Sequence, residues 1–186
     1  MGIPTLIKTE TASNSASLSF VDGASDVTLD STYDEYMFVF TDINPATDTV
    51  QFSFQVNATD DAGGGYDTST MCTTSFYSYH RESTDASELS YNYDTDTDKP
   101  ASFQPLAVGV GNGSDESCAG IMHLFNPAST TYVKHWYSRF SVYHAGSAEN
   151  AIYAAGYIND TTAVDDIQFK MDSGNMDGVI KMYGVG

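Results

Sequence analysis

Basic residues are scarce in this chain, which disfavours binding to polyanions such as nucleic acids and anionic membranes. The 186 residues include 7 Lys and Arg against 25 Asp and Glu, a formal net charge of −18. Nucleic-acid backbones and anionic membranes both need clustered Lys and Arg, so the sequence predicts neither partner. Salt shortens the Debye length to about 8 Å at 0.15 M, so the acidic composition suits a protein that works in brine.

Long apolar runs and paired cysteines are missing too. No stretch approaches the roughly 20 apolar residues of a membrane-spanning helix, and the N-terminus lacks the apolar region of a secretory signal. We therefore expect synthesis in the cytoplasm, followed either by retention there or by release through another route such as lysis. Cys72 and Cys118 lack the spacing of a zinc site. We expect two free thiols, with a disulfide as the alternative.

Alternation of apolar and polar side chains with a period of two dominates what is present. Val50–Val56 places Phe and Val on one parity and Gln and Ser on the other, and segments 16–20 and 167–171 repeat the pattern. Tyr36–Phe40 is an apolar run of strand length, and Tyr132–Tyr143 is long and aromatic. Such segments predict strands with one face on a core. We predict an all-β, antiparallel β-sandwich or jelly roll with long loops, formed by one domain over residues 1–186.

Turn residues separate the predicted strands. Asn44-Pro45 and Asn126-Pro127 each close a strand, and residues 173–178 predict a hairpin between 167–171 and 179–183. Long loops are expected over 57–70, 81–102 and 109–118, where binding residues often lie. The best candidate for a helical turn is Asp85–Leu89. Residues 1–12 form either an arm that extends over a neighbour or an ordinary first strand.

The serine, histidine and aspartate residues of this chain do not form a recognisable catalytic motif. The chain has no GxSxG motif, and its four histidines (His80, His123, His135, His144) lie in or beside strands, where packed or surface roles are usual. Asp94, Asp96 and Asp98 have a spacing that could bring carboxylates onto Ca²⁺, but Lys99 and Pro105 break the EF-hand pattern, which favours a charged loop tip. We therefore predict a non-enzymatic protein, with no catalytic, cofactor-binding or metal residues assigned.

Tyrosine clusters are the remaining candidate for binding. Phe76-Tyr77-Ser78-Tyr79 and Tyr91-Asn92-Tyr93 place aromatic rings on both parities of their segments. Outward rings could stack on a sugar or fill a subunit interface, and inward rings would pack in the core with the hydroxyl at the rim. Both alternatives stay open at this point.

Several longer stretches resemble a known group of proteins when they are taken together. They are Leu6–Ala12, Leu29–Tyr36, Asp42–Asp48, His123–Pro127, Thr131–His135, Ala155–Tyr157, Phe169–Asn175, and Asp177-Gly178 followed by Met182–Gly184. Together they resemble a widespread group of virion structural proteins of cyanophages and other marine bacteriophages. The resemblance spans nearly the whole chain, and the group has no catalytic residues to carry over.

What the resemblance implies is a jelly-roll or sandwich unit on a virus particle, often trimeric. As a capsid decoration (cement) protein, it would bridge neighbouring major capsid proteins on the capsid surface. As a tail or fibre component, it would contact other virion proteins and a host glycan. The decoration role is favoured because the chain lacks a coiled-coil heptad run and a fibrous repeat.

Overall fold

Antiparallel strands make up the whole regular structure of the described residues, with no helix among them. The structure is a computed structural model, and it describes residues 2–58, 66, 70–83, 85–93, 95 and 103–186. Its strands are β1 (Thr5–Ser15), β2 (Leu18–Val21), β3 (Glu35–Pro45), β4 (Val50–Ala58), β5 (Met71–Arg81), β6 (Ser87–Tyr91), β7 (Gln104–Val110), β8 (Cys118–Phe125), β9 (Lys134–His144), β10 (Ala148–Ile158), β11 (Val164–Met171) and β12 (Met176–Val185). None of the described segments is a helix that could span a bilayer.

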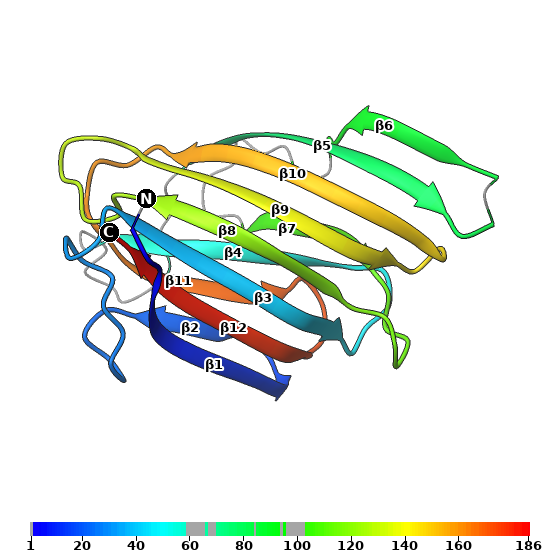
Figure 1. Ribbon diagram of the computed structural model, residues 1–186, viewed down its shortest axis with the longest axis horizontal. Coiled ribbons are helices and arrows are strands. Elements are labelled where there is room, and N and C mark those ends of the chain that lie inside the picture. The colour runs from blue at the N-terminus through cyan, green and yellow to red at the C-terminus, as the bar shows by residue number, and fades with distance from the viewer. Residues whose placement is uncertain (1, 59–65, 67–69, 84, 94, 96–102) are drawn as a thin grey trace.

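Eight of these strands form a jelly roll. Strand β1 pairs with β12, β2 with β11, β3 with β8, and β4 with β7, so the first strand of the eight meets the last and the pairing continues inward. Pairing of β12 with β3 and of β11 with β4 completes two four-stranded layers, β1-β12-β3-β8 and β2-β11-β4-β7. Figure 1 shows the two layers one behind the other. The predicted jelly roll is confirmed.

Two hairpins are inserted into this roll and widen its first layer. The β5–β6 hairpin lies between β4 and β7 in the chain, and the β9–β10 hairpin lies between β8 and β11. Strand β9 pairs with β8, and β10 pairs with β5, which gives an eight-stranded layer in the order β1-β12-β3-β8-β9-β10-β5-β6. The second layer has four strands, so it covers the body and leaves the β5–β6 end beyond its edge (Figure 1). Only the bridge between Val110 and His144 joins β7 to β9.

Aromatic side chains fill the space between the layers. Fully buried phenylalanines come from both layers, and Phe169 of β11 lies at their centre. Its ring centroid is 5.1 Å from that of Phe40 in β3 and 6.1 Å from that of Phe52 in β4. Trp136 of β9 packs edge-on against Phe54 at 5.0 Å. Edge-to-face and offset arrangements of this kind suit the quadrupoles of aromatic rings, so the core gains specific contacts in addition to apolar burial.

Most strands lie where the periodicity predicts them, but the polar parity of β4 is not solvated. Ser53, Gln55 and Asn57 are each less than 9 % exposed, so both faces of this strand are buried. The turns at Asn44-Pro45 and Asn126-Pro127 end β3 and β8 as expected. Lys134, at the start of β9, is fully buried, and its Nζ donates to the backbone carbonyls of Asp160 and Thr162.

Three expectations are corrected. Segments 167–171 and 179–183 do not form a hairpin, because β11 and β12 lie in different layers and residues 172–175 cross between them. There the backbone N–H of Ala46 donates to the carbonyl of Asn175, so this crossing packs against the crossing from β3 to β4. Asp85–Leu89 is no helical turn, since Ser87–Tyr91 form β6. The same strand interrupts the predicted loop 81–102.

Residues of the predicted N-terminal arm form an edge strand instead. Strand β1 pairs with β12 from Thr5 to Ser15, with irregular register at two points. The structure therefore shows the second of the two alternatives, the ordinary first strand. Most of β1 is exposed or only half-buried, and Ala12 is its one buried residue.

Candidate functional site: an aromatic face

The outer side of the eight-stranded layer presents an uninterrupted row of side chains. Because side chains alternate along a strand, residues paired across the ladders point to the same side. One such row crosses every strand of the layer: Thr9, Lys181, Val39, Ile121, Arg139, Tyr153, Phe76 and Tyr91. The row becomes aromatic where it enters the inserted hairpins.

Rings in this part of the sheet contact one another face to face. Tyr153 of β10 and Phe76 of β5 stack at 4.9 Å with an interplanar angle of 5°, and the Arg139 guanidinium lies 5.3 Å from the Tyr153 centroid on the β9 side. Tyr91 follows Phe76 in register and contacts Tyr93 at 4.7 Å. These rings remain accessible, since Phe76 is 48 % exposed. Arginine next to an aromatic stack is typical of protein interfaces.

A second group of rings lies on β8 and β9. His123 stacks on Tyr137 at 4.6 Å, and Phe125 lies 5.7 Å from the same ring. The other side of His123 is held by Glu35 of β3, whose carboxylate contacts Nδ1. Together with the first group, these residues define what we call the aromatic face: Phe76, Leu89, Tyr91, His123, Phe125, His135, Tyr137, Tyr153 and Tyr157. From β8 to β6 it spans four strand spacings, about 19 Å.

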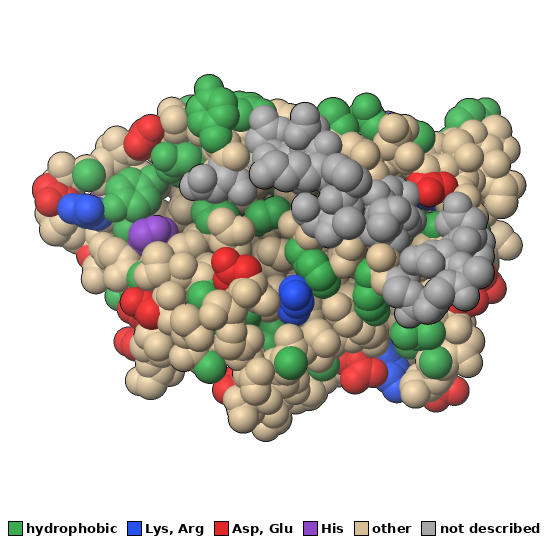
Figure 2. All heavy atoms as spheres, turned by 180° about the vertical axis from the view of Figure 1, so that it is seen from behind, with side chains coloured by type: hydrophobic (Ala, Val, Ile, Leu, Met, Phe, Trp, Pro, Cys, Tyr) green, Lys and Arg blue, Asp and Glu red, His purple; other side chains and the backbone are tan. Residues whose placement is uncertain are grey.

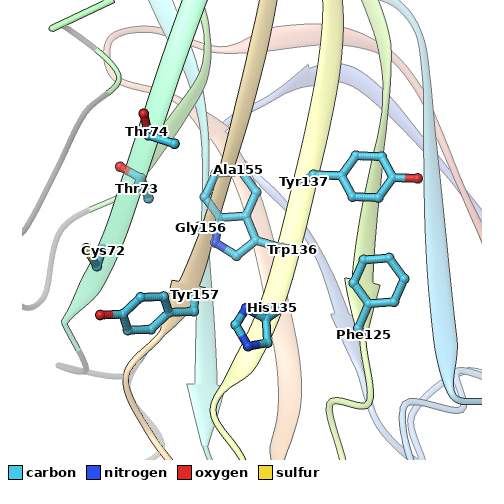
Figure 3. Close-up of a pocket in the computed structure, with 10 residues that line it drawn as sticks. All are labelled: Cys72, Thr73, Thr74, Phe125, His135, Trp136, Tyr137, Ala155, Gly156 and Tyr157. Carbon is cyan, nitrogen blue, oxygen red and sulfur yellow. The ribbon is translucent and has the colours of Figure 1, made fainter.

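A shallow hollow of about 420 Å³ lies on this face beside the second group of rings. Figure 3 shows it over β5, β10, β9 and β8, with the Tyr157 ring toward β5 and the Tyr137 and Phe125 rings toward β8. Small residues of β10, Ala155 and Gly156, lie between these rings. A side chain at Gly156 would come within 2.6 Å of the Cys72 carbonyl oxygen, so the close approach of β10 and β5 requires glycine there.

Acidic side chains avoid this face although the chain carries 25 of them. Among its outward positions on β8, β9, β10, β5 and β6 the one acid is Glu149, whose carboxylate accepts from the Ser141 hydroxyl at 2.9 Å. Figure 2 shows the opposite side of the molecule, where Asp and Glu side chains are scattered over the surface. The aromatic face is therefore close to neutral on a strongly negative protein. Exposed apolar patches of this kind mark contact surfaces.

The pKa values of two groups, one on this face and one in the core beneath it, are raised by their surroundings. A side-chain hydrogen bond with Cys72, followed by the charge of its thiolate, raises the pKa of the Tyr157 phenol. Burial raises the pKa of the Cys118 thiol to about 12. Cys118 is thus an inert core residue, while Cys72 is exposed at the rim of the hollow.

Both cysteines are free, as the first of the two alternatives expected. Cys72 lies on β5 and Cys118 on β8, with β9 and β10 between them. Three strand spacings separate the two strands by about 14 Å, which is beyond the reach of a disulfide.

The histidines and the predicted aspartate cluster are the remaining candidates from the sequence. The four histidines lie on strands: His123 and His135 belong to the aromatic face, His80 is exposed on β5, and His144 ends β9. Asp94, Asp96 and Asp98 lie outside the described residues. In the described part of the chain, no group of three His, Cys, Asp or Glu side chains is placed to hold a metal ion.

The tyrosine clusters divide between the two sides of the sheet. Phe76 and Tyr91 point outward, whereas Tyr77 and Tyr79 lie on the inner parity of β5. Some of these rings are therefore available for contacts on the surface, and others pack toward the inside of the sheet, so each of the two alternatives describes part of the cluster. Sequence reasoning did not single out Tyr153 and Tyr137 as part of this face. Their alternation with buried residues was visible, but it does not reveal that β10 lies between β9 and β5.

No family model matches this chain, and a comparison with curated proteins finds no significant relative.

Proposed function

We propose that this protein is a non-enzymatic structural component of a bacteriophage particle, attached to its neighbours through the aromatic face. Within the particle, the role we propose is that of a capsid decoration protein, which bridges major capsid proteins on the capsid surface. The observation that carries the proposal is the near-neutral aromatic face on a chain of charge −18.

Physical chemistry favours this face as the buried side of a contact. Tyr137 and Phe76 are 43 % and 48 % exposed, and Leu89 is 74 % exposed, so docking would remove a large apolar area from water. Interface cores are enriched in Tyr, Phe and Arg and depleted in Lys, Glu and Asp, as this face is. The acids would remain outside, where they keep particles apart.

A lattice of identical sites makes weak contacts sufficient. A decoration protein that touches several capsid subunits at once, for example as a trimer at a local symmetry axis, gains avidity from simultaneous contacts. The same repetition would spread mechanical load over many interfaces.

Binding of the purified protein to virions or empty capsids of the encoding phage, stripped of the protein, tests the proposal. We expect saturable co-sedimentation in hundreds of copies per particle, on the order of the number of capsid subunits. Replacement of Tyr137 and Tyr153 by Ser should weaken it by at least about tenfold, the loss of 1.4 kcal/mol. Tyr132→Ser is the matched control, because Tyr132 is 71 % exposed but lies outside the sheet.

Salt gives a second measurement. Apolar docking of an acidic protein onto a particle should hold or strengthen as salt rises, because screening removes repulsion between neighbouring copies. Binding that disappears with salt, or that survives the Tyr137 and Tyr153 changes, contradicts docking by this face.

A tail or fibre component that recognises a receptor is the second proposal, and copy number separates the two. Cryo-electron microscopy of the particle would find a decoration protein over the whole capsid and a tail protein at a single vertex. Light scattering measures the expected trimer, and a strict monomer at high concentration would count against the bridging role.

A further inference from the structure

A polar pocket lies beneath the inserted hairpins, on the side opposite the aromatic face. The inner parity of β5 and β10 turns toward the second layer, but that layer ends at β7. The space left has a volume of about 290 Å³, and its lining includes Tyr77, Tyr79, Glu88, Val108, His144 and Asn150. These residues come from five strands, so both insertions and the body contribute to the pocket.

One side of the pocket is formed where β7 packs closely against β9. Gly109 has a positive φ of 69°, and a Cβ atom there would lie 2.4 Å from Cδ2 and Nε2 of His144. The imidazole therefore lies directly over the glycine. Its Nδ1 accepts the backbone N–H of Gly146 at 2.9 Å, so the neutral ring carries its proton on Nε2. The Tyr79 ring meets it edge-on at 6.2 Å.

Polar side chains in the pocket are held in fixed positions, and two of them keep a donor or an acceptor available for a ligand. The Tyr79 hydroxyl accepts from Nε of Arg81 at 2.7 Å, which leaves its own proton to donate. Asn150 is 5 % exposed, and its Oδ1 has no hydrogen-bond partner among the residues that the structure describes. A buried amide oxygen without a donor is destabilising, and an entering hydroxyl group would supply that donor.

The lining selects the chemical class of the ligand. Two tyrosine rings offer faces for stacking, and an amide and a carboxylate offer acceptors for hydroxyl groups. Glu88 is the carboxylate of the lining. Because Arg81 beside Tyr79 is already paired with Asp85, the local charge stays negative and repels an anionic ligand. The volume is just below the usual range of small-molecule sites, about 300–1,000 Å³, and so suits a ligand no larger than one sugar ring.

We propose that this pocket binds a single neutral saccharide unit, such as the terminal hexose of a surface glycan. The pocket and the aromatic face lie on opposite sides of the same hairpins, so a docked protein could keep the pocket open to solvent. Repetition over a particle would turn weak single-site binding into firm attachment. The inference is independent of the proposed docking and would hold for either position in the particle.

Saturation-transfer NMR and calorimetry on the full-length protein test the inference, with neutral hexoses and N-acetylhexosamines as probes and uronic and sialic acids as anionic comparisons. We expect saturable binding of at least one neutral sugar and none of the anionic ones. Glu88→Gln, at an exposed side chain, and Tyr79→Ala should each weaken binding by at least about tenfold. Tyr137→Ala, on the opposite side of the sheet, should leave it unchanged.

Melting temperatures of the variants show whether each is folded, and Glu88→Gln keeps the test decisive if Tyr79→Ala is unstable. Failure of every neutral sugar to saturate, a preference for anionic sugars, or an equal loss in Tyr137→Ala would overturn the inference. Failure of capsid binding alone would overturn the docking proposal and leave the pocket intact.

Discussion

Replacement of Phe169 by Ala should be among the most damaging single changes in this protein. The side chain is fully buried, and its ring contacts five phenylalanine rings from three strands, β2, β3 and β4. The centroid distances are 6.3 Å to Phe20, 5.4 Å to Phe38, 5.1 Å to Phe40, 6.1 Å to Phe52 and 6.4 Å to Phe54. Because these partners belong to both layers, the cavity cannot close by the movement of one strand.

The expected loss follows from that geometry. Phe→Ala in a core costs about 3–5 kcal/mol, and a site that cannot collapse lies in the upper half of the range, so we expect about 4 kcal/mol. For a chain of this length, 1 kcal/mol corresponds to about 2–4 °C, so the melting temperature should fall by about 8–16 °C. Phe169→Leu, which keeps most of the volume, should cost less than half as much.

Urea and thermal denaturation followed by circular dichroism measure these losses. Phe76→Ala is the matched control, since Phe76 is half-exposed and stacks on one ring, and its loss should be about 1 kcal/mol. A cost of Phe169→Ala no larger than that of Phe76→Ala would refute the account of a core that joins the two layers through this ring.

Three further changes have defined outcomes. In the native protein a thiol reagent should modify Cys72 alone, and Cys118 only after unfolding, because burial raises the Cys118 pKa to about 12; mass spectrometry counts the adducts. Burial, with the neighbouring carboxylate of Asp166, raises the pKa of Asp165 in the folded state, so the folded state binds its proton more tightly than the unfolded one. The contribution of Asp165 to stability should therefore rise as pH falls through its raised pKa, and Asp165→Asn should be more stable than the parent at pH 7 and low salt by urea denaturation, with a smaller difference at acid pH. Lys134→Met should cost about 3 kcal/mol in the same assay, because two loop carbonyls lose a charged donor.

Local pattern predicted the strands, while pairing over long distances decided the site. The inward parity of 134–144 is visible in the sequence, since Trp136, Phe140 and Val142 share it and all are buried. The exposed rings of the same strand become a surface only because β10 and β5 bring Tyr153 and Phe76 beside them. The β9–β10 contact is local, but the pairing of β10 with β5 joins Tyr153 to Phe76, more than seventy positions away in the chain.

Two failures have the same physical origin. Turn residues between 171 and 179 indicate that the chain reverses, but a reversal within one layer and a crossing between layers use similar residues. Similarly, Ser53 and Gln55 look solvated from their parity, and their burial depends on what covers the outer side of β4. The pocket at Tyr79 and His144 was not predictable, because it exists only where the second layer ends.

Insertion of both hairpins between strands of a complete roll separates the evolution of the contact surface from that of the body. The pairing order of the eight body strands does not involve β5, β6 or β10, and β6 has β5 as its single ladder partner. Side chains on these hairpins can therefore change, and the hairpins lengthen or shorten, while the roll keeps its register. Other chains with this fold could carry the same scaffold with different outer surfaces, much as antibody frameworks carry different loops.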